Sequence, residues 1–89
     1  MNYYVYILQC NDDTLYTGIT TDIKRRLEEH NSSSKGAKYT KIRRPVSLVY
    51  EESCSDRSSA SKREYFIKQL SRKEKLDLVE KFKIKYLEK

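Results

Sequence analysis

Two polar side chains lie on the face of a predicted helix that should turn toward the protein interior. The hydrophobic pattern of residues 22–31 places Ile23 and Leu27 on the inward face of a helix. His30 falls on the same face and Arg26 at its edge, so the two side chains should be neighbours. An imidazole exchanges a proton near neutral pH, and a guanidinium carries a permanent positive charge. Taken alone, each residue has a simpler structural interpretation, in which His30 is a hydrogen-bonded core histidine; a functional site is indicated only when a third residue is considered with them.

A carboxylate occupies a comparable position on the next predicted helix. Ala60 and Ile67 mark the apolar arc of that helix, and Glu64 lies at the border of the arc. A carboxylate at such a position must be paired, hydrogen-bonded or bound to a cation, because burying it bare is costly. An ion pair with Arg26 would satisfy it. If instead both helices face the same surface of a sheet, Glu64, Arg26 and His30 form one site.

Tyr6 and Tyr16 differ from the other tyrosines of this chain because strand pairing can bring them together. Residues 3–10 and 15–20 read as two strands of a hairpin joined by a turn-forming segment. An odd number of loop residues would place Tyr6, Tyr16 and Gly18 on one face of the sheet, and an even number would separate the tyrosines. We expect a bulged, odd-numbered loop. A glycine within a strand often marks the close approach of another group.

The elements that position these residues form a small α/β (α+β) domain. The expected order is β-β-α-β-α-α, with a three-stranded, mostly antiparallel sheet flanked by three helices. A third strand is predicted at Pro45–Glu51 after a long polar loop, residues 32–44. Thr21 is the expected cap of the first helix. The second helix should begin after Ser55 or Asp56 and end near Leu70, and the third should open with a capping box at residues 71–74, its apolar face marked by Leu76, Val79, Phe82 and Tyr86.

Composition and charge narrow the class of protein. The net charge is +6, and residues 24–44 hold eight Lys or Arg against two Glu, which favours a polyanionic partner such as nucleic acid. We expect one domain at residues 1–80, with a charged end at 81–89. Cys10 and Cys54 form no metal or redox motif and are expected to be packing residues. No signal peptide or membrane span is expected, so the predicted location is cytoplasmic.

The ordered set of residues resembles the GIY-YIG nucleases. The tripeptide YVY at residues 4–6 is followed by YTG at residues 16–18, which is similar to the GIY…YIG signature. Arg26, His30 and Glu64 stand where this family carries an arginine, a histidine or tyrosine, and a metal-binding glutamate. The resemblance extends from Tyr3 to about Leu76 and is greatest to short bacterial members that consist of this domain alone.

The resemblance implies metal-dependent hydrolysis of a DNA phosphodiester. One Mg²⁺ ion, or Mn²⁺, would be held by Glu64 and waters. Tyr6 and Tyr16 would position the attacking water, and one of them would serve as or assist the base. The family alone does not indicate which tyrosine does so.

The remaining family residues would support that reaction. Arg26 would lower the pKa of a tyrosine and clamp the phosphate through its planar fork of donors. His30 would orient a tyrosine or move a proton, and Gly18 would leave room for backbone or substrate.

Affinity for DNA, branched or damaged DNA included, is expected to come from the basic loop. Contacts of this kind are largely independent of sequence and weaken with salt. The candidates are Lys35, Lys38, Tyr39, Lys41, Arg43 and Arg44. Tyr39 would either stack on an unpaired base or pack the loop against the domain. The leading prediction is an endonuclease of low sequence specificity with a role in DNA repair. The alternatives are a nucleic-acid-binding module with a vestigial site and a small subunit that acts beside a protein partner.

Overall fold

The computed structural model describes residues 2–87, with side chains through residue 84. In chain order the elements are β1 (Tyr3–Gln9), β2 (Leu15–Thr20), α1 (Ile23–Ser32), α2 (Lys38–Lys41), β3 (Ser47–Cys54), α3 (Arg57–Gln69) and α4 (Arg72–Leu87). The predicted fold class and element order are confirmed. The segment predicted as a loop contains one additional short helix, α2.

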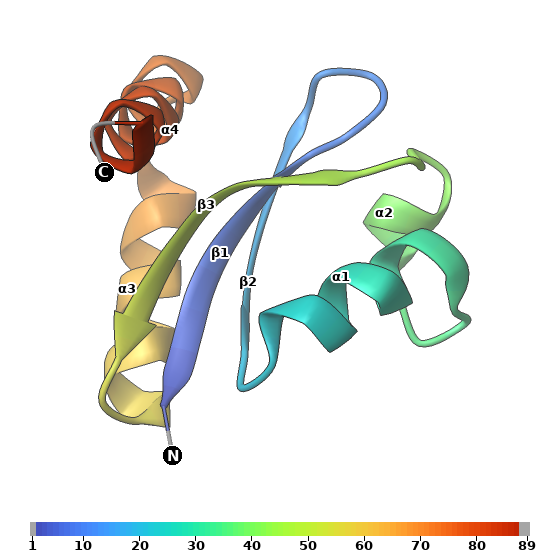
Figure 1. Ribbon diagram of the computed structural model, residues 1–89, viewed down its shortest axis with the longest axis horizontal. Coiled ribbons are helices and arrows are strands. Elements are labelled where there is room, and N and C mark those ends of the chain that lie inside the picture. Colours follow the sequence, from blue (N-terminus) through green and yellow to red (C-terminus); the bar gives the residue numbers. More distant parts are fainter. Residues whose placement is uncertain (1, 88–89) are drawn as a thin grey trace.

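The three strands form an antiparallel sheet in the order β2-β1-β3. Figure 1 shows α3 and α4 on one side of this sheet and α1 and α2 on the other. The central strand β1 is therefore covered on both faces, which explains why its sequence is a continuous apolar run. β2 and β3 are the two edges of the sheet.

Each face of the sheet carries its own hydrophobic core. On the face that α3 and α4 cover, the buried side chains are Val5, Ile7, Tyr50, Ala60, Ile67 and Val79. On the opposite face they are Tyr6, Leu8, Cys10 and Val46, with Tyr16, Ile23, Leu27 and Leu48 packed against them. Alternate residues of β1 point to opposite faces, so the single strand contributes to both cores. Both cysteines are free thiols.

Three predicted boundaries are wrong: the cap of α1, the start of β3, and the end of β3, which extends to Cys54 rather than Glu51. Side-chain hydrogen bonds explain the first two. The Asp22 side chain caps α1 by accepting from the Arg25 backbone N–H at 3.1 Å, so the cap is one residue later than the expected Thr21. β3 begins at Ser47 rather than Pro45. The Asn31 side-chain amide accepts from the Val46 N–H at 2.7 Å and donates to the Val46 carbonyl at 2.9 Å. These two backbone groups are therefore not available for pairing in the sheet.

The starts of α3 and α4 follow the sequence signals. The Asp56 side chain accepts from the Ser59 N–H at 2.7 Å and caps α3. Ser71 and Glu74 each accept the backbone N–H of the other, at 3.2 and 3.0 Å, which confirms the predicted capping box.

The predicted apolar face of α4 is correct only in part. Val79 is buried and Phe82 packs against the core. Leu76 is 41% exposed, and Leu78 packs against the core in its place. The side chain of Tyr86 lies outside the described residues.

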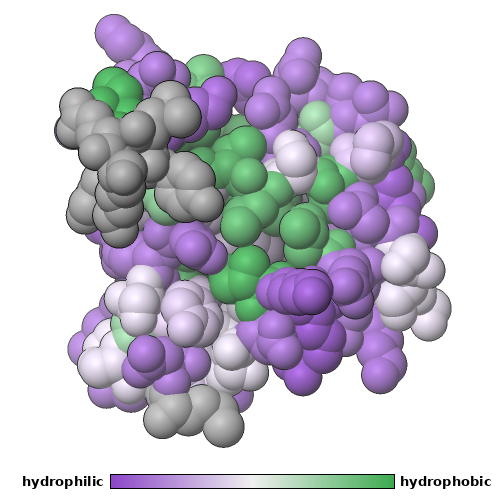
Figure 2. All heavy atoms as spheres, viewed as in Figure 1, coloured by the Kyte–Doolittle hydropathy of each residue, from purple (hydrophilic) through white to green (hydrophobic). Residues whose placement is uncertain are grey.

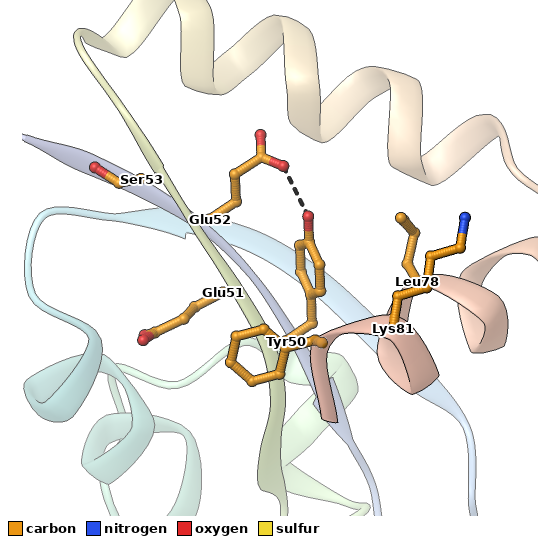
Figure 3. A pocket seen from close by; sticks show the side chains of 7 residues that line it. Tyr50, Glu51, Glu52, Ser53, Leu78 and Lys81 are labelled. Carbon is orange, nitrogen blue, oxygen red and sulfur yellow. Dashed lines mark hydrogen bonds between the residues drawn. The ribbon is translucent and has the colours of Figure 1, made fainter. Parts of the chain in front are cut away.

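A hollow of about 390 Å³ lies between β3 and α4, away from the residues predicted to do chemistry. Figure 2 shows apolar side chains gathered near the middle of this face, with hydrophilic residues around them. In Figure 3 Tyr50 and Leu78 line the hollow, and the Tyr50 hydroxyl donates to Glu52 at 2.7 Å. Glu52 also pairs with Arg63 at 3.0 Å. This network joins α3 to β3.

No helix within residues 2–87 has both the length and the apolar character that crossing a bilayer requires.

Candidate active site

The hairpin turn places Tyr6 and Tyr16 on the same face of the sheet. Asp13 N–H donates to the Cys10 carbonyl at 2.9 Å and Cys10 N–H to the Thr14 carbonyl at 2.8 Å, with Asp13 at φ 66°. This geometry is a three-residue turn with a bulge. The odd, bulged loop is therefore confirmed. Gly18 pairs with Tyr6, and the ring centroids of the two tyrosines are 6.5 Å apart.

Gly18 provides the space into which the Tyr6 ring extends. A Cβ atom at this position would lie 2.6 Å from the Tyr6 hydroxyl oxygen and 2.7 Å from Cζ. Because Gly18 belongs to an edge strand, the absence of a side chain lets the Tyr6 hydroxyl lie directly above the edge of the sheet.

We expect Gly18→Ala to displace the Tyr6 ring. Tyr6 is only 3% exposed, so its ring has little space in which to move. The overpacking should lower the free energy of unfolding by about 1–3 kcal/mol, measured by denaturant unfolding. Ser53→Ala, at an exposed position of the other edge strand, is the control and should be close to neutral. An unchanged stability in Gly18→Ala would show that the ring is not confined.

His30 lies at the centre of a buried chain of hydrogen bonds. The Tyr6 hydroxyl is 2.8 Å from His30 Nε2, and His30 Nδ1 is 2.8 Å from Thr40 Oγ1. His30 is fully buried, and its ring also contacts Tyr16 edge-on at 5.2 Å. Burial, followed by the positive charge of Arg26, lowers the pKa of His30 to about 4. The ring is therefore neutral at physiological pH.

The low pKa of His30 makes the protein sensitive to acid. The folded-state pKa of about 4 lies below the ordinary value of 6.5, so the unfolded chain binds the proton more tightly between these values. The contribution of His30 is fully present above pH 6.5 and is lost as the pH falls toward 4. We expect the free energy of unfolding to fall by about 2 kcal/mol between about pH 7 and about pH 5. Arg44 also lowers this pKa and Glu29 raises it.

Denaturant unfolding of the wild type and of His30→Phe, measured across this pH range, tests the effect. The variant has no imidazole, so its stability should change little between about pH 7 and about pH 5, whatever its absolute value. Carboxylates titrate mainly below this window. Parallel pH profiles for the two proteins would contradict the assignment.

Tyr6 is protonated at physiological pH. Burial raises the pKa of its phenol to about 12, and the nearby Arg26 guanidinium opposes this rise only in part. Tyr16 is less buried, and its hydroxyl makes no hydrogen bond with any other residue in the described part of the chain. The two tyrosines therefore differ: Tyr6 is connected to His30, and Tyr16 is available to solvent or a ligand.

Arg26 faces the tyrosines from the edge of α1, as predicted. Its Nη1 donates to Glu29 Oε1 and to the Lys35 carbonyl, both at 2.9 Å. These bonds hold the guanidinium in place while its side chain stays 26% exposed. Arg26 can therefore meet an anion from solvent without leaving the neighbourhood of Tyr6.

Glu64 does not approach the tyrosines from the expected direction. α3 packs on the face of the sheet opposite to α1, so the condition stated above, that both helices face the same surface of the sheet, is not met. The carboxylate forms an ion pair with Lys68 at 3.1 Å, not with Arg26. Even so, Glu64 is close enough to raise the pKa of Tyr6, although less than burial or Tyr16 does. The Tyr6 hydroxyl lies over Gly18 at the edge of the sheet. We infer that the carboxylate of Glu64 influences the pKa of Tyr6 across this edge.

A divalent metal ion would have to rely on few protein ligands here. No group of three or more His, Cys, Asp or Glu within the described residues is arranged to hold one. Mg²⁺ is compatible with such a site, because it keeps several waters and takes one or two carboxylates together with substrate phosphate. Glu64 is such a carboxylate, with its side chain 24% exposed at the edge of the sheet. The donor set therefore fits Mg²⁺ and does not fit a metal that needs an all-protein cage.

The predicted nucleic-acid-binding residues fall into two groups. Lys35, Lys38 and Lys41 are exposed. Arg43 pairs with Asp12 at 3.0 Å and lies 3.8 Å above the Tyr39 ring.

Arg44 and Tyr39 also contact the protein. Arg44 donates to the carbonyls of Glu29, His30 and Ser33 at the end of α1, at 3.3, 2.6 and 2.7 Å. The Tyr39 ring stacks with that of Tyr16, the centroids being 6.0 Å apart.

Sequence reasoning missed Thr40 and the cationic hollow beside Tyr39. Thr40 is fully buried and contacts His30, but a four-residue helix has too few residues for periodicity to reveal its inward face. The hollow, of about 230 Å³, also receives Arg72 and Lys75 from α4. These residues are distant in sequence from the basic loop, so only the fold brings them to Tyr39.

Comparison with known proteins shows the family to which the chain belongs. Residues 2–77 match the model of the GIY-YIG catalytic domain, and the chain belongs to this family of nuclease domains. A UPF0213 protein of Desulfotalea psychrophila is 69% identical over 77 residues, covering 86% of this chain and 70% of the relative.

Solved structures of two relatives have the same fold. The UPF0213 protein BH0048 of Bacillus halodurans is 49% identical, with a TM-score of 0.58 over 90% of this chain and 84% of the other. The protein EF2693 of E. faecalis is 42% identical, with a TM-score of 0.65 over 94% and 88% of the two chains.

Proposed function

We propose that this protein is a Mg²⁺-dependent endonuclease that hydrolyses DNA phosphodiesters with little sequence specificity. The observation that carries the proposal is the buried hydrogen bond between the Tyr6 hydroxyl and the Nε2 of a neutral His30, 2.8 Å long. It gives Tyr6 a partner that can take its proton, beside a partly exposed arginine and a second tyrosine.

Tyr6 and His30 would together remove a proton from the attacking water. An attacking water gives a proton to the Tyr6 oxygen as Tyr6 gives its own proton to His30 Nε2. The resulting hydroxide forms the new bond to phosphorus, the bond to the leaving oxygen breaks, and that oxygen takes a proton from solvent. Tyr16 orients the water, since its hydroxyl has no hydrogen-bond partner among the described residues.

Arg26 connects substrate binding to this transfer. Its charge is the second cause, after burial, of the low pKa of His30. A phosphate bound by the Arg26 guanidinium would offset that charge, so the basicity of His30 would rise when substrate is present. Arg26 would also hold the phosphate through two parallel N–H donors.

Glu64 would hold the metal ion together with waters and the substrate phosphate. A bound Mg²⁺ ion stabilises the negative charge that develops on the phosphate and the leaving oxygen. Lys68 would release the carboxylate, which costs little because the Lys68 side chain is 50% exposed.

Exposed cations near the tyrosines would bind the DNA backbone. Lys35, Lys38 and Lys41 are exposed on and before α2, and Arg72 and Lys75 line a hollow together with Tyr39. Contacts of this kind neutralise phosphates without reading bases, which supports low sequence specificity. A preference for branched or damaged DNA and a role in repair are part of the proposal.

Nicking of supercoiled plasmid DNA tests the proposal most directly. The purified protein should convert supercoiled to open circular DNA with Mg²⁺ or Mn²⁺ and stop when EDTA removes the metal. Salt-sensitive binding of DNA without nicking would contradict the proposed endonuclease activity and would support a nucleic-acid-binding module. Failure to bind DNA at about 50 mM salt, where phosphate contacts are strong, would support a subunit that acts beside a protein partner.

A further inference from the structure

The short helix α2 carries a buried residue among exposed cations. Lys38 and Lys41 are exposed, whereas Thr40 is fully buried. The side chain of Thr40 points toward α1 and lies 2.8 Å from His30 Nδ1. A surface segment that only bound a nucleic acid backbone would not need a hydroxyl directed into the domain.

The directions of three hydrogen bonds follow from one carbonyl group. Thr40 Oγ1 lies 2.9 Å from the Ala37 carbonyl oxygen, which can only accept, so Thr40 donates its one proton there. At His30 Nδ1 the Thr40 oxygen must therefore accept, and Nδ1 carries the proton of the imidazole. A neutral imidazole has one N–H, so Nε2 is free to accept from the Tyr6 hydroxyl. The chain runs from Tyr6 through His30 and Thr40 to Ala37.

We propose that Thr40 is a positioning residue, which holds His30 in the tautomer that can take the proton of Tyr6. The catalytic part of this inference rests on the proposed nuclease function. The tautomer itself does not, because it follows from the hydrogen bonds of the folded protein.

The opposite tautomer would disable the contact with Tyr6. With the proton on Nε2, His30 would donate to the Tyr6 oxygen and could not accept from it. Thr40 would have to turn its proton from the Ala37 carbonyl to Nδ1; that carbonyl would keep the backbone N–H groups of Thr40 and Lys41, at 3.1 Å each. The hydroxyl proton of the buried Tyr6 would lose its acceptor. An unmade buried hydrogen bond is costly, so the Nδ1–H form, which keeps all three bonds, is favoured over the Nε2–H form, which keeps two.

The single histidine of this chain makes the tautomer directly measurable. In ¹⁵N NMR spectra of the wild type, Nδ1 should show the shift of a protonated ring nitrogen and Nε2 that of an unprotonated one. Thr40→Ser keeps the hydroxyl and should keep this pattern. Thr40→Val has nearly the same shape without the hydroxyl and should shift the population toward the Nε2–H form. Ile42→Ala, at an 80% exposed residue directly after the same helix, is the control and should match the wild type.

The nicking rate gives a second, separable result. Thr40→Val should reduce kcat about 10- to 100-fold with little change in KM, and Thr40→Ser should restore most of the rate. A wild-type spectrum with the proton on Nε2 overturns the inference, as does an unchanged tautomer in Thr40→Val. If nicking is absent from every protein while the spectra behave as expected, the nuclease proposal fails and the tautomer assignment stands.

Discussion

Glu64→Ala is expected to lower the rate of plasmid nicking by about 10³-fold, because metal ions contribute several kcal/mol to stabilising charge on a transferring phosphate. The substitution removes the carboxylate that is proposed to hold the ion. It should leave the fold intact, since the Glu64 side chain is 24% exposed and pairs only with the exposed Lys68. Titration with Mg²⁺ should show no saturable activation of the variant.

Lys68→Ala is the matched control for this experiment. It breaks the same ion pair but keeps the carboxylate, so nicking should remain within about twofold of the wild type. Thermal unfolding of both variants shows whether the fold is retained. Equal nicking by Glu64→Ala and the wild type would show that Glu64 has no role in the reaction. An equal loss of nicking in Lys68→Ala and Glu64→Ala would show that the ion pair, and not the carboxylate as a metal ligand, is required.

Tyr6→Phe is expected to lower kcat by about 10²–10⁴-fold, the range of a lost general base. The ring would remain in place over Gly18, while the hydroxyl that connects the water to His30 would be absent. His30 Nε2 would lose its donor, so the free energy of unfolding should also fall by about 1–3 kcal/mol. Single-turnover nicking rates and denaturant unfolding measure the two effects separately.

Tyr16→Phe distinguishes the roles of the two tyrosines. The Tyr16 hydroxyl has no hydrogen-bond partner among the side chains of residues 2–84 or the described backbone, so its removal should not change stability. The expected loss of activity is smaller than for Tyr6→Phe, because orientation of the water would suffer but proton transfer would not. Tyr65→Phe, at a residue that is 68% exposed, controls for the substitution itself. A larger loss in Tyr16→Phe than in Tyr6→Phe would make Tyr16 the base.

The sequence was sufficient to predict the sheet and the tyrosine pair. Strand periodicity and turn chemistry are local, so the order of elements and the odd loop followed from residues close together in the chain. The inward positions of Arg26 and His30 followed from helical periodicity in the same way. Those predictions needed only one helix or one hairpin at a time.

The parts that failed depend on contacts between distant segments. The sheet face that α3 covers is decided by how the chain crosses from β3, and no pattern within residues 57–69 specifies it. Thr40 meets His30 through a packing arrangement of α2 on α1, and the sequence signals only a polar loop there. Likewise, the backbone groups of Val46 are taken by Asn31 from another element, so a local strand pattern placed the start of β3 too early.

The capping of α1 by Arg44 changes how much charge the basic segment can offer to DNA. Affinity for a polyanion grows with the number of condensed counterions that the protein displaces, roughly one per phosphate neutralised. Arg44 is held by backbone carbonyls and Arg43 by Asp12, so neither guanidinium is free to approach a phosphate without breaking internal bonds. Within this segment, the entropy gained from released ions would therefore come from Lys35, Lys38 and Lys41, and the two arginines would keep the segment folded.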